Sequence, residues 1–145
     1  AETGHLVLAT LHTPDASQTV DRILDVFDAH RQTEIKVQLA DCLQGVISQQ
    51  LLPRQDGPGR LVAYEIMIAT PAVRNLIREH ATDQIATVLQ TGGSYGMCTM
   101  DACIKALYDK KAISYETALQ RLKNIGEFHL LGKSDSSRKR FLSHH

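Results

Sequence analysis

The feature that most constrains the fold is an apolar run near the start of the chain. Residues 6–11 are apolar except for one threonine, and His5 and His12 flank the run. A run this short and this apolar is typical of a β-strand covered on both faces, as in the parallel sheet of an α/β protein. Such a strand needs neighbours on both sides, and the rest of the chain offers few. We favour the interpretation that the run is a strand of a larger α/β domain. The alternative is that it pairs with a hairpin predicted around residues 53–59 in a small mixed sheet.

Two amphipathic helices are predicted after the run, because apolar residues recur there at intervals of three and four. The first helix carries Val20, Ile23, Leu24 and Phe27, with charged residues between them. The second carries a longer stripe, which we expect to comprise Ile35, Leu39, Cys42, Leu43, Val46, Ile47 and Leu51.

A β-hairpin is predicted at the centre of the chain. The stretch PRQDGPG at 53–59 is rich in turn residues, and the stretch RLVAYEIMIA at 60–69 is strongly β-like. Extended runs on both sides of a Gly-Pro-Gly loop are typical of a hairpin. Pro53 favours an edge position for the first strand, because proline has no N–H to donate to the ladder.

The sequence from residue 70 onward predicts helices. Thr70 is suited to cap a helix and Pro71 to occupy its first position. A short helix is expected around 85–89, followed by a flexible glycine-rich break. Two more helices are expected, at 97–111 and after a cap at Ser114.

The composition narrows the class of protein. Sixteen basic and sixteen acidic residues cancel, so nothing in the charge balance indicates nucleic acid as a partner. Three cysteines without CxxC spacing argue against a disulfide framework and exclude a four-thiolate zinc site within one chain. The apolar runs fall short of the ~20 residues that span a bilayer, and we expect no signal peptide before Gly4. We expect a cytoplasmic protein without membrane insertion.

The two histidines that flank the apolar run are candidates for a site. On a strand, positions seven apart point to opposite faces, so His5 and His12 are not expected to share a metal ion. His12 lies at the carboxyl end of the predicted strand, where open α/β sheets bind ligands that are often phosphorylated. An imidazole there can donate a hydrogen bond to a phosphate oxygen. His5, at the other end, is expected at the surface.

Other motifs give weaker signals. The glycine-rich stretch at 92–96 lacks the GxxxxGK[ST] pattern of a phosphate-binding loop, and no G-x-S-x-G or H-E-x-x-H motif is present. We therefore expect no cofactor-binding loop and no metal site in the chain. Arg74, Arg78 and Glu79 lie in the segment AVRNLIRE, where an ordinary solvated helix face with internal ion pairs is the default interpretation.

Taken together, four segments resemble the pilus retraction ATPase family (PilT), hexameric motors of type IV pili within the secretion ATPase superfamily. The segment at 1–13, AETGHLVLATLHT, is similar to the family's His box, and the segments at 21–27, 64–79 and 90–107 follow in the family's order and spacing. The resemblance extends over about residues 1 to 128.

The segment AVRNLIRE is the most specific part of the resemblance. It differs from the family's usual AIRNLIRE only at Val73, and this motif separates retraction motors from relatives in pilus extension and type II secretion. Those relatives typically carry a four-cysteine insert, which the cysteine count excludes here. Tyr64 stands where the family often has histidine.

The resemblance implies a fold and a domain organisation. Residues 1–69 are expected to be the C-terminal half of a RecA-like ATPase core, with a buried strand, helices and a β-hairpin. Residues 70–131 are expected to form a helical C-terminal subdomain, and residues 132–145 a disordered tail. In the family, a PAS-like domain and the Walker A and Walker B motifs precede the His box, so we expect this chain to be the C-terminal part of the motor.

The resemblance also implies roles for individual residues. His12 corresponds to a sensor of the terminal phosphate of the nucleotide, and His5 belongs to the same box, with a structural or interface role. The retraction motif comprises Val73, Arg74, Asn75, Leu76, Ile77, Arg78 and Glu79.

The implied function is that of a hexameric motor that hydrolyses ATP to power pilus retraction and twitching motility. ATP and Mg²⁺ are expected to bind the full-length parent, whereas this chain, without the Walker motifs, is expected to be inactive and to bind neither tightly. The expected partners are other copies of the motor and the platform protein of the inner membrane. The alternatives are an accessory retraction or type II secretion ATPase, or a non-enzymatic module that binds another subunit.

Overall fold

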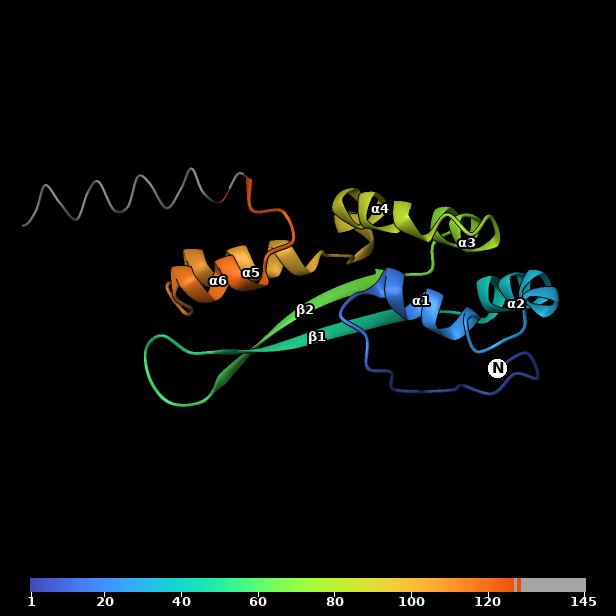
Figure 1. The fold of residues 1–145 in the computed structure, drawn as a ribbon, viewed down its shortest axis with the longest axis horizontal. Helices are drawn as coiled ribbons and strands as arrows, with labels where there is room; N and C mark the ends of the chain where they lie inside the picture. The colour runs from blue at the N-terminus through green and yellow to red at the C-terminus, as the bar shows by residue number, and fades with distance from the viewer. Residues whose placement is uncertain (127, 129–145) are drawn as a thin grey trace, which may run out of the picture. The chain divides into compact units, whose positions relative to one another are not determined.

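The computed structural model describes residues 1–126 and residue 128. Helices precede and follow a central hairpin, as Figure 1 shows. In chain order the elements are α1 (Ala16–Leu24), α2 (Ala29–Cys42), β1 (Gly45–Pro53), β2 (Arg60–Ile68), α3 (Pro71–Arg78), η1 (Thr82–Gln84), α4 (Ile85–Thr91), η2 (Gly92–Tyr95), α5 (Met100–Asp109) and α6 (Tyr115–Arg121). The predicted tail at 132–145 lies outside the described residues.

The chain forms two compact units. The first comprises residues 1–50 and 64–100, and the second comprises residues 51–63 and the described residues from 101 onward. Each strand of the hairpin therefore has one end in each unit. The expected domain boundary between residues 69 and 70 stays a prediction.

The predicted β-hairpin is confirmed. Strands β1 and β2 form a two-stranded sheet around the loop that contains the Gly-Pro-Gly sequence. In that loop the Arg54 guanidinium donates two hydrogen bonds of 2.9 Å to the Asp56 carboxylate. These bonds hold the pKa of Asp56 below its usual value, and both side chains are exposed.

The second predicted helix is shorter than its apolar stripe indicated. Helix α2 ends at Cys42, and Leu43 is already extended, with ψ of 130°. Val46, Ile47 and Leu51 lie in β1, so their assignment to the helix was wrong. Gly45 disfavours a helix, and the β-branched residues Val46 and Ile47 after it favour the extended conformation of a strand.

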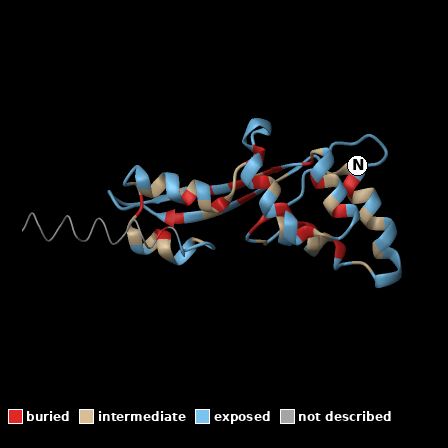
Figure 2. Ribbon diagram, turned by 90° about the horizontal axis from the view of Figure 1, so that it is seen from above, coloured by how far each residue is buried: buried red, intermediate tan, exposed pale blue. Residues whose placement is uncertain are grey.

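The expectation of a buried strand at residues 6–11 is wrong in this structure. The run has no regular secondary structure, and its exposed side chains include Leu6 at 83%, Val7 at 59% and Leu8 at 88% (Figure 2). The run does not pair with the hairpin either, because among residues 1–126 and 128 the sheet consists of β1 and β2. The described residues supply no adjacent strand, so the backbone N–H and C=O groups of the run would lack hydrogen-bond partners if the run were buried.

The first unit has a continuous apolar core to which helices and β2 contribute (Figure 2). The core residues are Ala16, Val20, Leu24, Ala40, Met67, Val73, Ile77, Ile85, Leu89 and Met97. The predicted apolar face of the first helix is confirmed in part, because Val20 and Leu24 are fully buried. Burying a side chain of this size contributes about 1.5–3 kcal/mol.

The glycine-rich stretch predicted as a flexible break forms the 3₁₀-helix η2. A Cβ atom on Gly92 would lie 2.3 Å from the terminal methyl group of Met97 and 3.0 Å from its Cβ atom, so a larger residue at position 92 would force this buried side chain to shift. Gly96 ends the stretch with φ of 81°, in the left-handed region that favours glycine.

The second unit contains α6 and the cap predicted for it. The Ser114 hydroxyl accepts a hydrogen bond of 3.1 Å from the Thr117 amide. The rings of Tyr108, Tyr115 and Phe128 pack together, with centroids 4.9 Å apart for Tyr108 and Phe128 and 5.2 Å apart for Tyr115 and Phe128.

Candidate functional site

The retraction motif lies on helix α3, and its last residue, Glu79, caps the C-terminal end of that helix. The Thr70 hydroxyl accepts from the Val73 amide at 3.4 Å, and Pro71 occupies the start of the helix, as the sequence predicted. Val73 and Ile77 are fully buried in the core of the first unit. Because side chains three to four residues apart share a helix face, this burial fixes which way the polar residues of the motif point.

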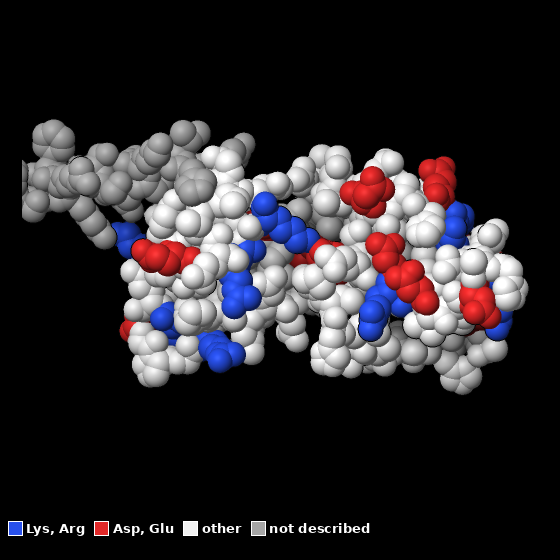
Figure 3. All heavy atoms as spheres, viewed as in Figure 1, with Lys and Arg blue, Asp and Glu red and all other residues white. Residues whose placement is uncertain are grey.

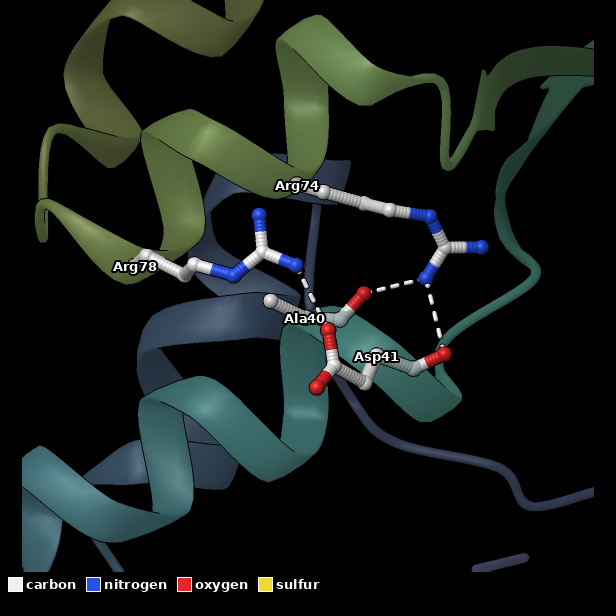
Figure 4. A network of polar contacts seen from close by, with 4 residues as sticks. All are labelled: Ala40, Asp41, Arg74 and Arg78. Atoms are coloured by element: carbon white, nitrogen blue, oxygen red, sulfur yellow. Dashed lines mark hydrogen bonds and ion pairs between the residues drawn. The ribbon is translucent and has the colours of Figure 1, made fainter.

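Two arginines of the motif contact the C-terminal end of α2 (Figure 4). The Arg74 guanidinium donates to the carbonyl oxygens of Ala40 and Asp41, the latter at 2.9 Å. The Arg78 guanidinium pairs with the Asp41 carboxylate at 2.5 Å. These contacts join residues more than thirty positions apart in the chain.

The chemistry of a helix end explains this arrangement. The last carbonyl groups of a helix have no partner within the helix, and the partial negative charge there favours a cation. Helix α2 has no basic residue in its last turn, and Asp41 adds negative charge at that end. Arg74 and Arg78 supply the missing donors and the positive charge, so the motif is more than an ordinary solvated face.

The other polar residues of the motif point to solvent. Asn75 and Glu79 are exposed, and the Asn75 amide donates to the Glu79 carboxylate at 2.9 Å. The remaining motif residue, Leu76, is partly buried against the core. The exposed pair is thus the part of the motif that is open to a partner.

Both histidines are exposed. His5 shares a hydrogen bond of 3.0 Å with the Thr3 hydroxyl, through its Nδ1 atom. His12 has no hydrogen-bond partner among the residues that the structure describes, and it lies in the segment between the apolar run and α1. The geometry leaves the His12 imidazole available to a ligand, and no hydrogen bond or ion pair in the described part of the chain joins His5 or His12 to the retraction motif.

The segment after His12 is held firmly. The hydroxyls of Thr13 and Thr19 are 2.6 Å apart, and the buried Asp15 carboxylate caps α1 by accepting from the Gln18 amide at 2.7 Å. A residue from β2, Glu65, also accepts from the Ala16 amide at 2.9 Å. This contact of Glu65 was not predicted from the sequence, although a glutamate in a β-like apolar stretch is a signal for a bonded, buried carboxylate.

One cavity among the described residues does not suit a phosphate. It has a volume of about 370 Å³ and lies beside α1 and α2. Its lining includes the apolar side chains of Ile23, Phe27, Ile35 and Leu39, and no lysine or arginine.

The charged residues form no metal cluster within the described range. No group of three or more His, Cys, Asp and Glu residues there lies close enough to hold a metal ion. The face drawn in Figure 3 carries both basic and acidic side chains, in keeping with the balanced formal charge. None of the described helices is long and apolar enough to cross a membrane.

Comparison with known proteins defines the class first. A family model described as "Type II/IV secretion system protein" matches residues 1–105. The chain belongs to this family of secretion proteins.

Individual relatives then specify the branch and confirm the resemblance to pilus retraction ATPases. The Type IV pilus retractation ATPase PilT of Pseudomonas aeruginosa is 51% identical over 123 residues, which are 85% of this chain and 36% of the relative. A twitching motility protein of Neisseria gonorrhoeae is 52% identical over 124 residues, 86% of this chain and 33% of the relative. The chain thus spans about one third of the length of these relatives.

A solved structure supports the fold. The crystal structure of the pilus retraction motor PilT with bound ADP superposes with a TM-score of 0.76 at 41% identity, covering 88% of this chain and 35% of that structure. The predicted α/β fold, with a hairpin and following helices, is therefore confirmed, because it is similar to part of that solved structure.

Proposed function

We propose that this chain is the C-terminal part of a hexameric, ATP-driven motor that powers type IV pilus retraction and twitching motility. The observation that carries the proposal is 51% identity to a PilT retraction ATPase over 85% of the chain. The segment AVRNLIRE, through its resemblance to the motif of retraction motors, supports retraction rather than pilus extension.

In this proposal, the full-length motor hydrolyses ATP with Mg²⁺, and this chain supplies part of the machinery. Phosphoryl transfer needs a phosphate cradle, a metal ion and a residue that positions the attacking water. His12 fits one further role, because an exposed imidazole without a partner can donate a hydrogen bond to the terminal phosphate. The sequence has no GxxxxGK[ST] loop, so the chain alone neither hydrolyses ATP nor binds it tightly.

Helix α3 transmits the effect of ATP turnover in this proposal. Its buried side holds it to the core, and Arg74 and Arg78 fix the end of α2. Asn75 and Glu79 remain exposed, and they contact a neighbouring subunit of the homo-hexamer or the platform protein of the inner membrane. The motor acts at the cytoplasmic face of that membrane.

Complementation in cells tests the proposal. The full-length gene is expressed in a strain that lacks its retraction motor but still makes pili. We expect restored twitching, together with Mg²⁺-dependent ATP turnover by the purified protein. Twitching restored only when the strain's own retraction motor is present would instead identify an accessory ATPase. If the purified protein does not hydrolyse ATP and twitching is not restored with or without the strain's own motor, the protein would be a non-enzymatic module.

A further inference from the structure

We propose that Glu65 is a positioning residue for His12. Its carboxylate joins the first residue of α1, which follows His12 closely, to the first residue of α5, so it sets where the imidazole stands relative to bound nucleotide. The inference rests on the proposed function, in which His12 contacts the terminal phosphate.

Glu65 lies on the buried face of β2. Side chains alternate along a strand, and its neighbours on the same face, Ala63 and Met67, are fully buried. Glu65 itself is only 6% exposed. A carboxylate on such a face is costly unless its oxygens are hydrogen-bonded, so its presence requires an explanation.

Each oxygen of the Glu65 carboxylate has its own backbone partner. Oε1 accepts from the Ala16 amide at 2.9 Å, and Oε2 accepts from the Met100 amide at 3.1 Å. Ala16 is the first residue of α1, and Met100 is the first residue of α5. The first amides of a helix lack partners within the helix, and negative charge is favourable there.

The Ala16 contact lies four positions from His12. Between them, Thr13 is bonded to Thr19, and Asp15 caps the same helix. These two contacts tie the segment to its own helix. The bond from Glu65 comes from 49 positions away along the chain, so it fixes the helix start, and with it His12, to the hairpin strand.

A glutamine at position 65 cannot replace both bonds. Its amide group offers one oxygen acceptor, and its NH₂ group faces a backbone N–H that also needs an acceptor. Glu65→Gln therefore keeps the size of the side chain and releases one of the two segments. A role limited to stability would lower the melting temperature without acting through His12.

A double-mutant cycle in the full-length hexamer separates these two roles. The variants are Glu65→Gln, His12→Ala and their combination, with Glu116→Gln as the matched control on an exposed position of α6. We expect Glu65→Gln to lower kcat about tenfold while the KM for ATP changes less than about twofold. In the His12→Ala background the same substitution should have no further effect on kcat, although it lowers the melting temperature equally in both backgrounds.

A second variant removes the donor instead of the acceptor. Ala16→Pro deletes the amide that Glu65 binds, and proline is tolerated at the first position of a helix. The extended backbone of Asp15, with φ of −151° and ψ of 170°, is compatible with a following proline. We expect the same loss of kcat as for Glu65→Gln. If Glu65→Gln does not yield a folded hexamer, Ala16→Pro takes its place in the cycle.

The outcomes separate this inference from the proposed function. An equal loss of kcat in both backgrounds, or no loss at all, overturns the role of Glu65 and leaves the motor assignment intact. Normal turnover of His12→Ala alone shows that the histidine is not a sensor, and both the sensor role and the inference then fail.

Discussion

Arg74 and Asn75 are neighbours in the chain with different structural roles. Arg74 is half-buried and bonded to two carbonyl groups of α2, whereas Asn75 is exposed and bonded only within its own helix. A substitution of Arg74 therefore perturbs both the packing of α3 on α2 and the proposed coupling of ATP turnover to retraction. A substitution of Asn75 probes the outward face of the motif alone, and it is the better test of coupling.

Asn75→Ala in the full-length motor is expected to leave folding and hexamer formation intact, because exposed substitutions change stability by less than about 0.5 kcal/mol. ATP turnover should persist, and twitching should be lost or sharply reduced. Twitching zones and thermal unfolding measure the two effects. Asn124→Ala, at an exposed position outside α3, is the control. Normal twitching by the Asn75 variant would show that this face of the motif is ordinary scaffold.

The two arginines are expected to differ in their contribution to stability. Arg74→Ala removes charge-assisted hydrogen bonds to carbonyls at a helix end and should cost about 1–3 kcal/mol. Arg78→Ala should cost less than about 1 kcal/mol, because its side chain and that of Asp41 are 40% and 58% exposed. Chemical denaturation compares the two variants. The reverse order of effects would mean that the contacts to α2 are not the anchor of the motif.

His12→Ala is expected to lower turnover of the full-length motor about 10- to 100-fold, with a smaller effect on nucleotide affinity. A donor to the terminal phosphate acts where charge changes in the transition state, so its loss falls mainly on kcat. Steady-state kinetics and nucleotide binding, measured on the same preparation, check the split. A variant that loses affinity but keeps kcat would contradict the sensor role.

At the scale of elements, features determined by neighbouring residues were predictable. The cap and first position of α3, the cap of α6 and the hairpin loop follow from residue types a few positions apart. The contact of Arg74 with α2 was not predictable, because it joins positions 33 and 34 apart in the chain. Of the candidate site, the sequence predicted which residues belong to the motif but not what the arginines bind.

The two wrong element predictions have physical causes. The helical spacing of apolar residues in α2 continues past position 43 into β1. The periodicity alone therefore did not show that the helix ends there. The run at 6–11 has the composition of a buried strand, but a strand forms only beside a partner. Glu65 was readable in principle, because alternation along β2 places it on the face that is buried.

A pair of leucine substitutions tests the state of the apolar run. In the 145-residue chain, Leu24→Ala should cost about 2–5 kcal/mol, because Leu24 is fully buried. Leu8→Ala should cost less than about 0.5 kcal/mol, because Leu8 is 88% exposed. Urea denaturation measures both. A large loss for Leu8→Ala would show that the run is packed, as the sequence alone indicated.

At the scale of the whole molecule, the motifs present in the chain indicate which parts of the proposed motor it supplies. It provides the His box segment, the retraction motif and the helices around them, and it has no phosphate-binding loop motif. The aligned residues make up only 36% and 33% of two of its relatives, so most of each relative lies outside the alignment. We infer that sensing and transmission reside in this chain and that the phosphate cradle belongs to the rest of the motor.

Retraction of individual pili tests the central claim most directly. Cells that lack their own retraction motor express the full-length protein, and fluorescently labelled pili are followed in time. We predict that pili shorten in these cells and that they do not shorten in cells that express the Asn75→Ala variant. Pili that extend but never shorten, although the purified protein hydrolyses ATP with Mg²⁺, would contradict the assignment of this chain to a retraction motor.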